Sequence, residues 1–289
     1  MKSTSLSARA ALLSALIFLL VLAVWHVATL PVPAAAPAQN LSSEQIEYLK
    51  LQGKDPLGGG TKASGFPTLR DMWNTAVHHL AEPFYDRGPN DKGIGLQLAY
   101  SLARVALGFL LAAAVAIPLG FALGMSPLVY QALYPYINVL KPISPLAWMP
   151  LALYTIKDSS VSGVFVIFIC SLWPMLINTA HGVANVRRDW LDVSRTLEVN
   201  PLRKAFRVIL PAAAPTILTG MRISMGIAWL VIVAAEMLVG GTGIGYFVWN
   251  EWNNLSLTNV LFAILMIGVV GMALDSVFGV LSKRVAYQE

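Results

Sequence analysis

The sequence has little charge and almost no cysteine. Only 12% of its 289 residues are charged and 56% are hydrophobic, whereas a soluble domain carries about twice that share of charge. This composition argues against a water-soluble globular domain. Cys170 is the one cysteine and stands in an apolar run, so no disulfide can form within the chain, and a small buried hydrophobic side chain is the expected role.

The sequence also lacks the marks of a nucleic-acid binder. The net charge is +5, but lysine and arginine are spread among apolar runs and form no basic face with interleaved aromatic residues. The surplus of positive charge is therefore interpreted as a signal of orientation in the membrane, and no nucleic-acid partner is expected.

Signs of catalysis are missing as well. No serine or cysteine nucleophile stands with a positioned base, and the adjacent His78 and His79 have the wrong spacing to share a metal. The stretch Gly58–Lys62 lacks the phosphate-loop spacing, and Gly240–Gly245 follows an apolar helix and not a strand. We expect a chain that is not an enzyme, holds no cofactor or metal, and has no nucleotide-hydrolysing machinery of its own.

Long apolar runs dominate what is present. Ala10–Leu30 has no formal charge for about 20 residues, which is enough to cross roughly 30 Å of hydrocarbon. Lys2, Arg9 and the Pro- and Ala-rich stretch after the run give a superficial likeness to a cleaved signal peptide, but the run is longer than a usual signal core. Residues 1–30 are therefore predicted to be a short tip and a retained first transmembrane helix.

A polar segment, 31–95, separates this helix from the rest. It contains two short helical patterns, Ser42–Leu51 and Thr68–Leu80, and the second places an apolar face along one side. We expect this face to lie along the membrane surface. The segment is predicted to be an excursion outside the membrane.

Five further apolar spans fill a transmembrane domain predicted over 96–284. Their approximate bounds are 96–124, 130–156, 160–183, 208–238 and 255–281. Pro127 best fits the turn between the first two of these spans, and Pro142, Pro145 and Pro150 imply that the second is kinked. With the first helix, the fold class is all-α and integral to the membrane, with six transmembrane helices.

Basic residues predict the orientation of these helices. They cluster before the first helix, in the loop 184–207, and after the last span at Lys283 and Arg284, and in a six-span topology all three places lie on one side. The positive-inside rule makes that side cytoplasmic. Both termini are therefore predicted to be cytoplasmic, and the 31–95 excursion to face the periplasm of a bacterium.

The loop 184–207 is too polar to span a membrane, yet its apolar residues are periodic. Two sets at helical spacing stand on either side of Asn200-Pro201: Val186, Trp190, Val193 and Leu197, then Leu202, Phe206 and Ile209. Two short amphipathic helices on the cytoplasmic face account for this pattern. Such a stripe fits a groove on a partner protein, and it equally fits an interfacial helix resting on lipid.

The residues of the loop resemble a known motif. Asp192–Glu198 (DVSRTLE), followed by Ile209-Leu210-Pro211, is similar to the EAA loop of binding-protein-dependent ABC importer permeases. Asp192 matches the motif's Glu and Ser194 its second Ala, whereas Glu198 stands where Gly is usual. The departure at Glu198 concerns the shape of the turn.

The resemblance implies a fold, a function and partners. It covers about Asp91–Lys283 and implies the type I ABC importer permease fold, in a homodimer in the bacterial inner membrane. In that family the loop is a coupling helix seated in a cleft of a separate ATPase, which binds the ATP, and a periplasmic binding protein delivers the solute. The coupling-loop residues that this implies are Trp190, Asp192, Val193, Ser194, Arg195, Leu197, Glu198 and Pro211.

Several stretches are similar to the branch that imports nitrate, with relatives for bicarbonate and cyanate. They include Asp91-Lys92-Gly93, Val164–Ile169 and Gly240–Gly245 leading to Trp249. The resemblance therefore implies transport of a small inorganic oxyanion, nitrate first. A taurine or alkanesulfonate permease is the alternative within the family, and a membrane-anchored sensor or interaction protein is the alternative from another class.

Charged residues also fall within or beside the predicted spans. Each costs roughly 2.5 to 3.5 kcal/mol at the centre of a membrane helix, so each is expected to face protein or a wet path. Arg222 and Glu236 are separated by about four helical turns, roughly 21 Å, and cannot touch. Arg104, Arg222 and Glu236 are candidates for an anion path. The alternative is that the arginines pair with Asp275, Glu236 or loop carbonyls and hold the helices in place.

Overall fold

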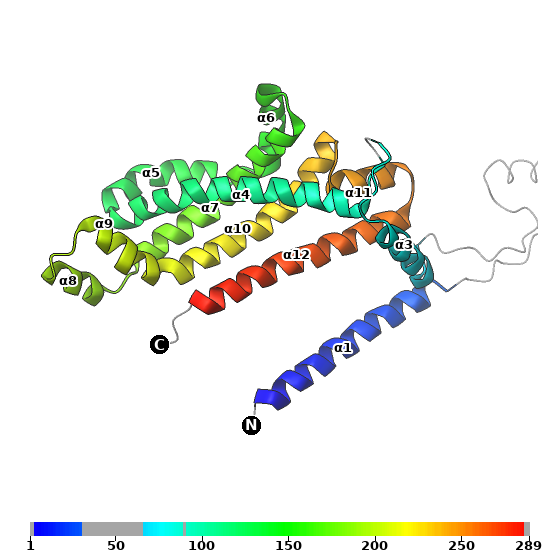
Figure 1. Ribbon diagram of the computed structural model, residues 1–289, viewed down its shortest axis with the longest axis horizontal. Coiled ribbons are helices and arrows are strands. Elements are labelled where there is room, and N and C mark those ends of the chain that lie inside the picture. The colour runs from blue at the N-terminus through cyan, green and yellow to red at the C-terminus, as the bar shows by residue number, and fades with distance from the viewer. Residues whose placement is uncertain (1–2, 31–65, 89–90, 286–289) are drawn as a thin grey trace, which may run out of the picture. The chain divides into compact units, whose positions relative to one another are not determined.

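The computed structural model describes residues 3–30, 66–88 and 91–285 (Figure 1). The predicted helix Ser42–Leu51, the stretch Gly58–Lys62 and most of the 31–95 segment lie outside these residues. The chain divides into two compact units. One comprises 1–78 with Ser256–Phe262, and the other comprises 79–255 with 263–289.

The first unit contains α1 (Ser3–Ala28) and most of α3 (Leu69–Ala81). The Trp25 indole, near the end of α1, donates a hydrogen bond of 2.9 Å to the carbonyl of Pro67, just before α3. Apolar side chains along α1 are exposed nearly throughout, which a helix in water would not tolerate over this length. A lipid environment accounts for this pattern.

The second unit is built on long helices joined by short ones. Its elements are α4 (Ile94–Met125), α5 (Pro127–Leu140), a 3₁₀ turn (Pro145–Ala147), α6 (Trp148–Ile156), α7 (Ser159–Ala184), α8 (Arg188–Thr196), α9 (Pro201–Lys204), a π-helical turn (Ala205–Ile209), α10 (Leu210–Val239), α11 (Ile244–Asn253) and α12 (Leu257–Val285). Its described residues form no strand beyond an isolated antiparallel bridge between Asp86 and Lys92.

α4, α7 and α10 pack side by side and form the core of this unit (Figure 1). Small residues recur every fourth position on the face of α4 that contacts α7: Gly108, Ala112, Ala116, Gly120 and Gly124. A Cβ atom at Gly120 would lie 2.5 Å from the Cβ of Thr179 on α7. The two backbones therefore approach each other closely only because these side chains are small.

The segment expected to be one kinked span, 130–156, is two helices. α5 and α6 are separated by Lys141–Ser144 and the 3₁₀ turn, so the expected kink is a full break. Pro142 and Pro145 remove backbone donors, and Ser144, which precedes Pro145, is extended with ψ at 128°. The turn before α5 lies at Ser126 and Pro127, as expected from the sequence.

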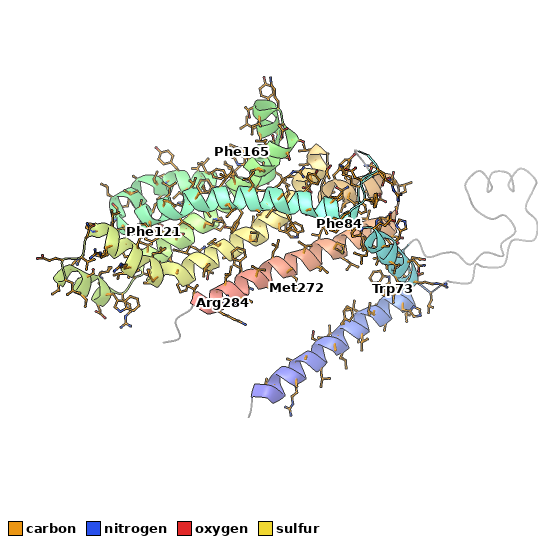
Figure 2. The ribbon with its side chains drawn as sticks, in the orientation of Figure 1. Trp73, Phe84, Phe121, Phe165, Met272 and Arg284 are labelled. Carbon is orange, nitrogen blue, oxygen red and sulfur yellow. The ribbon has the colours of Figure 1, made fainter. Side chains whose placement is uncertain are left out.

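Five described helical segments are long and apolar enough to cross a membrane: Ala8–Ala28, Ile94–Met125, Ser159–Ala184, Pro201–Val239 and Leu257–Val285. α5 and α6 together make up the remaining expected span. Exposed apolar side chains cover these helices, as Met272 on α12 illustrates with 66% of its surface exposed (Figure 2). The described residues are therefore those of a helical integral membrane protein.

Candidate functional site

α8 and its flanks lie at one end of the second unit (Figure 1). They stand next to the start of α10, because α9 leads into α10 through the π-helical turn. Asp189 in the first turn and Arg195 in the last turn of α8 complement the helix dipole. Leu191 packs against a core cluster formed by the ends of α7 and α10, and Ser194 is 4% exposed. One face of this short helix thus packs against the bundle, and the other face is exposed.

The outward face carries the large apolar side chains. We call it the α8–α9 surface and define it by Trp190, Val193, Leu197, Leu202 and Phe206. These side chains are 44% to 71% exposed in the isolated chain.

Two residues assigned to these stripes from the sequence do not belong to the surface. Val186 and Ile209 are 7% and 4% exposed and lie in the core cluster, because each stands at a point where the segment joins the bundle. The predicted stripe is therefore correct in its middle and wrong at its two outer positions.

The turn after α8 explains why glycine would be usual at position 198. Glu198 has φ at +47°, in the left-handed region that favours glycine. Its amide donates to the carbonyl of Arg195 at 2.9 Å, and the amide of Val199 donates to that of Ser194 at 3.1 Å. These two bonds form a Schellman motif with Glu198 at its left-handed position. The turn keeps the geometry that glycine would give, at a backbone cost of about 1 kcal/mol.

The remaining coupling-loop candidates have distinct places. Arg195 donates to Asp192 at 2.9 Å within the exposed face of α8, and such a pair contributes only a few tenths of a kcal/mol. Ser194 donates its hydroxyl proton to the carbonyl of Leu191 at 2.7 Å, against the core. Pro211 lies just after the π-helical turn, and a wider turn accommodates a residue that has no amide proton to donate.

Arg104 and Glu236 lie at the opposite end of α10 and form an ion pair. The Nη1 of Arg104 and the nearer carboxylate oxygen of Glu236 are 2.8 Å apart, and the two side chains are 14% and 5% exposed. Arg104 also donates to the hydroxyl of Ser160 on α7 and to the carbonyl of Thr242 after α10. One guanidinium thus joins three helices and a loop.

The Glu236 carboxylate is fully surrounded by donors. Besides Arg104, it accepts from the hydroxyl of Ser101 at 2.8 Å and from the amide of Gly245 at 3.0 Å. A Cβ atom at Gly245 would lie 2.0 Å from the carbonyl oxygen of Val233, so the start of α11 approaches α10 this closely only with glycine there.

Sequence reasoning missed the partners of this ion pair. Gln97 accepts from the amide of Gly243 at 2.6 Å, and Ser101 accepts from the amide of Ile244 at 2.9 Å. Gln97, Ser101 and Arg104 recur at i, i+4 and i+7 on an otherwise apolar helix, and that spacing is the signal that could have found them. We call these groups, with Glu236 and residues 242–245 at the start of α11, the Arg104–Glu236 network.

Arg222 has a different partner from the other two path candidates. Its Nε donates to the carboxylate of Asp275 on α12 at 2.6 Å, and the side chains are 45% and 56% exposed. Arg222 and Glu236 are not brought together. The structure therefore resolves the three candidates into one buried network and one half-exposed pair.

The described residues were also compared with the requirements of a metal site. No group of three or more His, Cys, Asp or Glu side chains there could hold a metal ion. His79 instead packs edge-on against the ring of Phe247, with centroids 5.5 Å apart. The arrangement as a whole is a helix bundle with a buried polar network at one end and an exposed apolar surface at the other.

Comparison with known families assigns residues 116–287 to one of them, the binding-protein-dependent transport system inner membrane component. The match begins within α4 and runs through α12, so it includes the α8–α9 surface, Arg222 and Glu236.

Several curated proteins are similar over most of the chain. A nitrate import permease protein from a Synechocystis species is 44% identical over 79% of this chain and 83% of its own length. A counterpart with the same name from Leptolyngbya laminosa is 43% identical over 76% of this chain and 78% of its own length. A bicarbonate transport system permease protein from Synechocystis is 42% identical over 72% of this chain and 74% of its own.

A solved structure shares the fold. One chain of the MetNI methionine ABC transporter, in an inward-facing conformation, superposes with a TM-score of 0.59 at 12% identity. The superposition covers 66% of this chain and 95% of that one. At this identity the likeness speaks to the fold alone.

Proposed function

Because the chain belongs to the family of binding-protein-dependent transport system inner membrane components, we propose that it is the permease subunit of an ATP-driven importer for a small inorganic oxyanion, nitrate first. The observation that carries the docking part of this proposal is the α8–α9 surface. Five large apolar side chains stand exposed on helices that the bundle core holds in place. A partner's groove is the environment that such a face fits.

The proposed orientation places the α8–α9 surface and both termini in the cytoplasm. Basic residues flank the surface at Arg187, Arg188, Arg203 and Lys204, and the positive-inside rule supports this side. The Arg104–Glu236 network then lies at the periplasmic end, toward the binding protein. Two copies of the chain form the permease, and lipid covers the exposed apolar faces of the long helices.

The energy for transport comes from outside this chain. We propose that ATP binds to two separate ATPase subunits, each seated on one α8–α9 surface, and that their closure moves α8 and α9 together with α10. The continuous helix from α9 through the π-helical turn into α10 supports this coupling, because a rigid element transmits a displacement along its length. The chain itself acts as a non-catalytic transport subunit.

The substrate proposal rests on the relatives. The similar curated proteins named above carry nitrate or bicarbonate in their names, and both are small planar anions with one negative charge. Nitrate takes precedence because the nitrate relatives are slightly more similar. Bicarbonate is the second candidate, and competition between the two anions would rank them.

Among the path candidates, we propose that Arg104 and Glu236 hold the periplasmic end of the bundle together. Each is held by three protein partners, Arg104 by Glu236, Ser160 and the Thr242 carbonyl, and Glu236 by Arg104, Ser101 and the Gly245 amide. Arg222 is half exposed and stays a candidate for the path. Neutralising Arg222 and measuring uptake alongside membrane abundance separates the roles: normal abundance with lost uptake supports the path, and lost abundance supports a structural pair.

Uptake of isotopically labelled nitrate tests the proposed function. The chain is deleted in its native host and restored from a plasmid, with membrane abundance measured in parallel. We expect uptake to disappear on deletion, to return with the wild-type chain and to require ATP. Unchanged uptake of nitrate and of bicarbonate on deletion would refute the substrate proposal. Failure to recover any ATPase subunit with the detergent-solubilised chain would favour the sensor alternative.

A further inference from the structure

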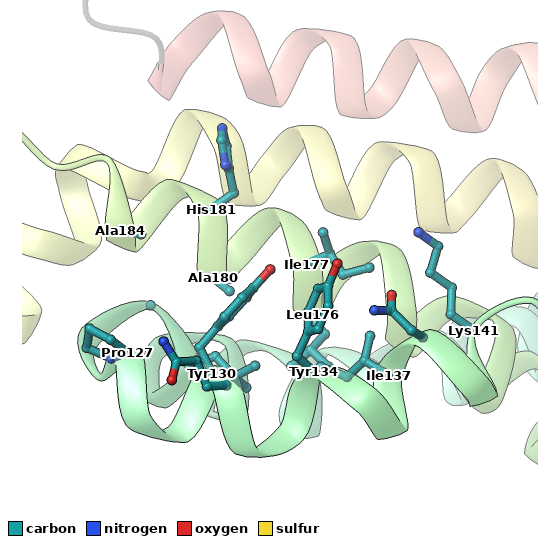
Figure 3. Close-up of a pocket in the computed structure, with 14 residues that line it drawn as sticks. Pro127, Tyr130, Tyr134, Ile137, Lys141, Leu176, Ile177, Ala180, His181 and Ala184 are labelled. Atoms are coloured by element: carbon teal, nitrogen blue, oxygen red, sulfur yellow. The ribbon is translucent and has the colours of Figure 1, made fainter.

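A groove runs between α5 and α7, away from every site described above. Two cavities form it, with volumes of about 520 and 420 Å³. Lys141 and Ile177 line both cavities, so the two adjoin at these residues. Figure 3 shows Lys141 at the end of α5, with its side chain extending to the same side as the rings of Tyr130 and Tyr134.

Polar residues recur along the face of α5 that lines the groove. Tyr130, Tyr134, Asn138 and Lys141 are spaced i, i+4, i+8 and i+11, which places them on one side of a helix. The first two rings are in contact, with centroids 5.5 Å apart and planes tilted by 34°. This spacing can be read from the sequence, but the apolar residues between these four polar residues led us to expect an ordinary membrane span there.

α7 contributes further polar groups from the facing wall. His181 lies along the larger cavity and Asn178 along the smaller one. The amide group of Asn178 donates to the carbonyl of Pro174 at 2.8 Å, which fixes its orientation. The groove is therefore lined on both sides by groups able to hydrogen-bond.

The charge within the groove has one sign. Neither cavity is lined by Asp or Glu. Among the described residues, the ammonium group of Lys141 has no hydrogen-bonding or ion-pair partner, whereas Arg104 and Arg222 each have a carboxylate. A cation at membrane depth without a counter-ion is costly, so it faces water or an anion.

We propose that the groove binds a small inorganic oxyanion, with Lys141 as its counter-ion and Tyr134 and Asn138 as neutral donors beside it. The donor set is an ammonium, a hydroxyl and an amide, and an anion with several acceptor oxygens matches it. The site deepens the proposed function, on which it rests, because it identifies where the transported anion meets positive charge inside the membrane. A contact with a second copy, in which a partner's carboxylate neutralises Lys141, is the rival outcome.

Substitution of Lys141 is the first test. In the complete transporter, K141M removes the charge and keeps the length of the side chain, and K141R keeps the charge. Lys157, exposed after α6, supplies a matched control as K157M. We expect K141M to lower nitrate uptake at least about tenfold at normal membrane abundance, K141R to keep most of it, and K157M to change nothing. Normal uptake by K141M would overturn the proposal.

A second test keeps Lys141 intact and serves if K141M does not reach the membrane. Cys170 is the only cysteine and is buried, so Ile177→Cys in a Cys170→Ala background places one reactive thiol in the groove. We expect an anionic methanethiosulfonate reagent to label it faster than a cationic one of similar size, and nitrate to slow the labelling relative to gluconate at equal ionic strength. Equal labelling by both reagents without protection by nitrate would overturn the proposal.

Failure of the proposed function and failure of the proposed anion site give different results. If the wild-type transporter carries neither nitrate nor bicarbonate, the proposed function fails. If it carries nitrate while K141M does so equally well, the groove alone is refuted. Loss of the chain's self-association in K141M, with labelling of Ile177→Cys unaffected by nitrate, would assign Lys141 to a contact between copies and would also overturn the anion site.

Discussion

The two ends of α10 carry different kinds of side chain, which are buried to different degrees. At one end, the Arg104–Glu236 network buries two charges and supplies each with partners from the same chain. At the other end, the α8–α9 surface leaves Trp190 and its apolar neighbours in the open. The first end is complete in one chain, whereas the second, in the proposed docking, is completed by another molecule.

This difference separates interactions that hold the fold from interactions that serve assembly. A buried ion pair contributes little net stability when intact, because desolvation offsets the attraction, but removal of one partner is severe. An exposed apolar side chain contributes little to the fold and much to an interface. Substitutions at the first end should therefore lower the stability of the fold, whereas substitutions at the second end should weaken assembly with a partner.

The largest effect is expected from R104M. It leaves the Glu236 carboxylate buried with Ser101 and the Gly245 amide but without a cation, at a cost of about 3 to 5 kcal/mol. Thermal unfolding in detergent should show a large drop in the midpoint, together with lower membrane abundance. R284M, on the exposed last turn of α12, is the control and should leave the midpoint unchanged. A stable R104M would show that the network does not hold this end.

A smaller effect, confined to assembly, is expected from W190A. Trp190 and Trp249 are both 44% exposed and lie beyond opposite ends of α10, so W249A is a matched control. Loss of an interface tryptophan weakens binding by about 2 kcal/mol, roughly thirtyfold. Recovery of the ATPase with the purified chain should therefore fall for W190A alone, with both variants unfolding at the wild-type temperature. Equal recovery from both would remove Trp190 from the docking surface.

Much of this contrast could be predicted from the sequence. Apolar length and the scarcity of charge indicate the membrane helices, and helical spacing indicates the exposed stripe on α8. Local pattern could not show that Val186 and Ile209 turn inward, because tertiary packing decides that. It offered Glu236 and Asp275 as partners of the arginines but could not assign Glu236 to Arg104 and Asp275 to Arg222, since each pair joins helices far apart in the sequence. The break at Lys141–Ser144 was expected only as a kink, because a proline permits either outcome.

The smallest effect is expected from E198G, which refines the shape of the α8–α9 surface. Glycine removes the backbone cost of φ at +47° and should stabilise the turn by up to about 1 kcal/mol. E198A removes the charge and keeps the Cβ atom, so it is the control. Hydrogen exchange at the Val199 amide, which donates to Ser194, should slow in E198G and not in E198A. Equal exchange rates in the two variants would show that the change comes from loss of the Glu198 charge and not from the backbone conformation.

Site-specific crosslinking from Val193 tests the central claim most directly, namely that the α8–α9 surface is where a separate ATPase docks. Val193 and Val269, on α12, are 59% and 53% exposed, so a cysteine at each, in a Cys170→Ala background, carries the same photocrosslinker with similar freedom. The account predicts an adduct between this chain and an ATPase subunit from V193C in native membranes, and none from V269C. No ATPase adduct at V193C, or equal adducts at both positions, would contradict it.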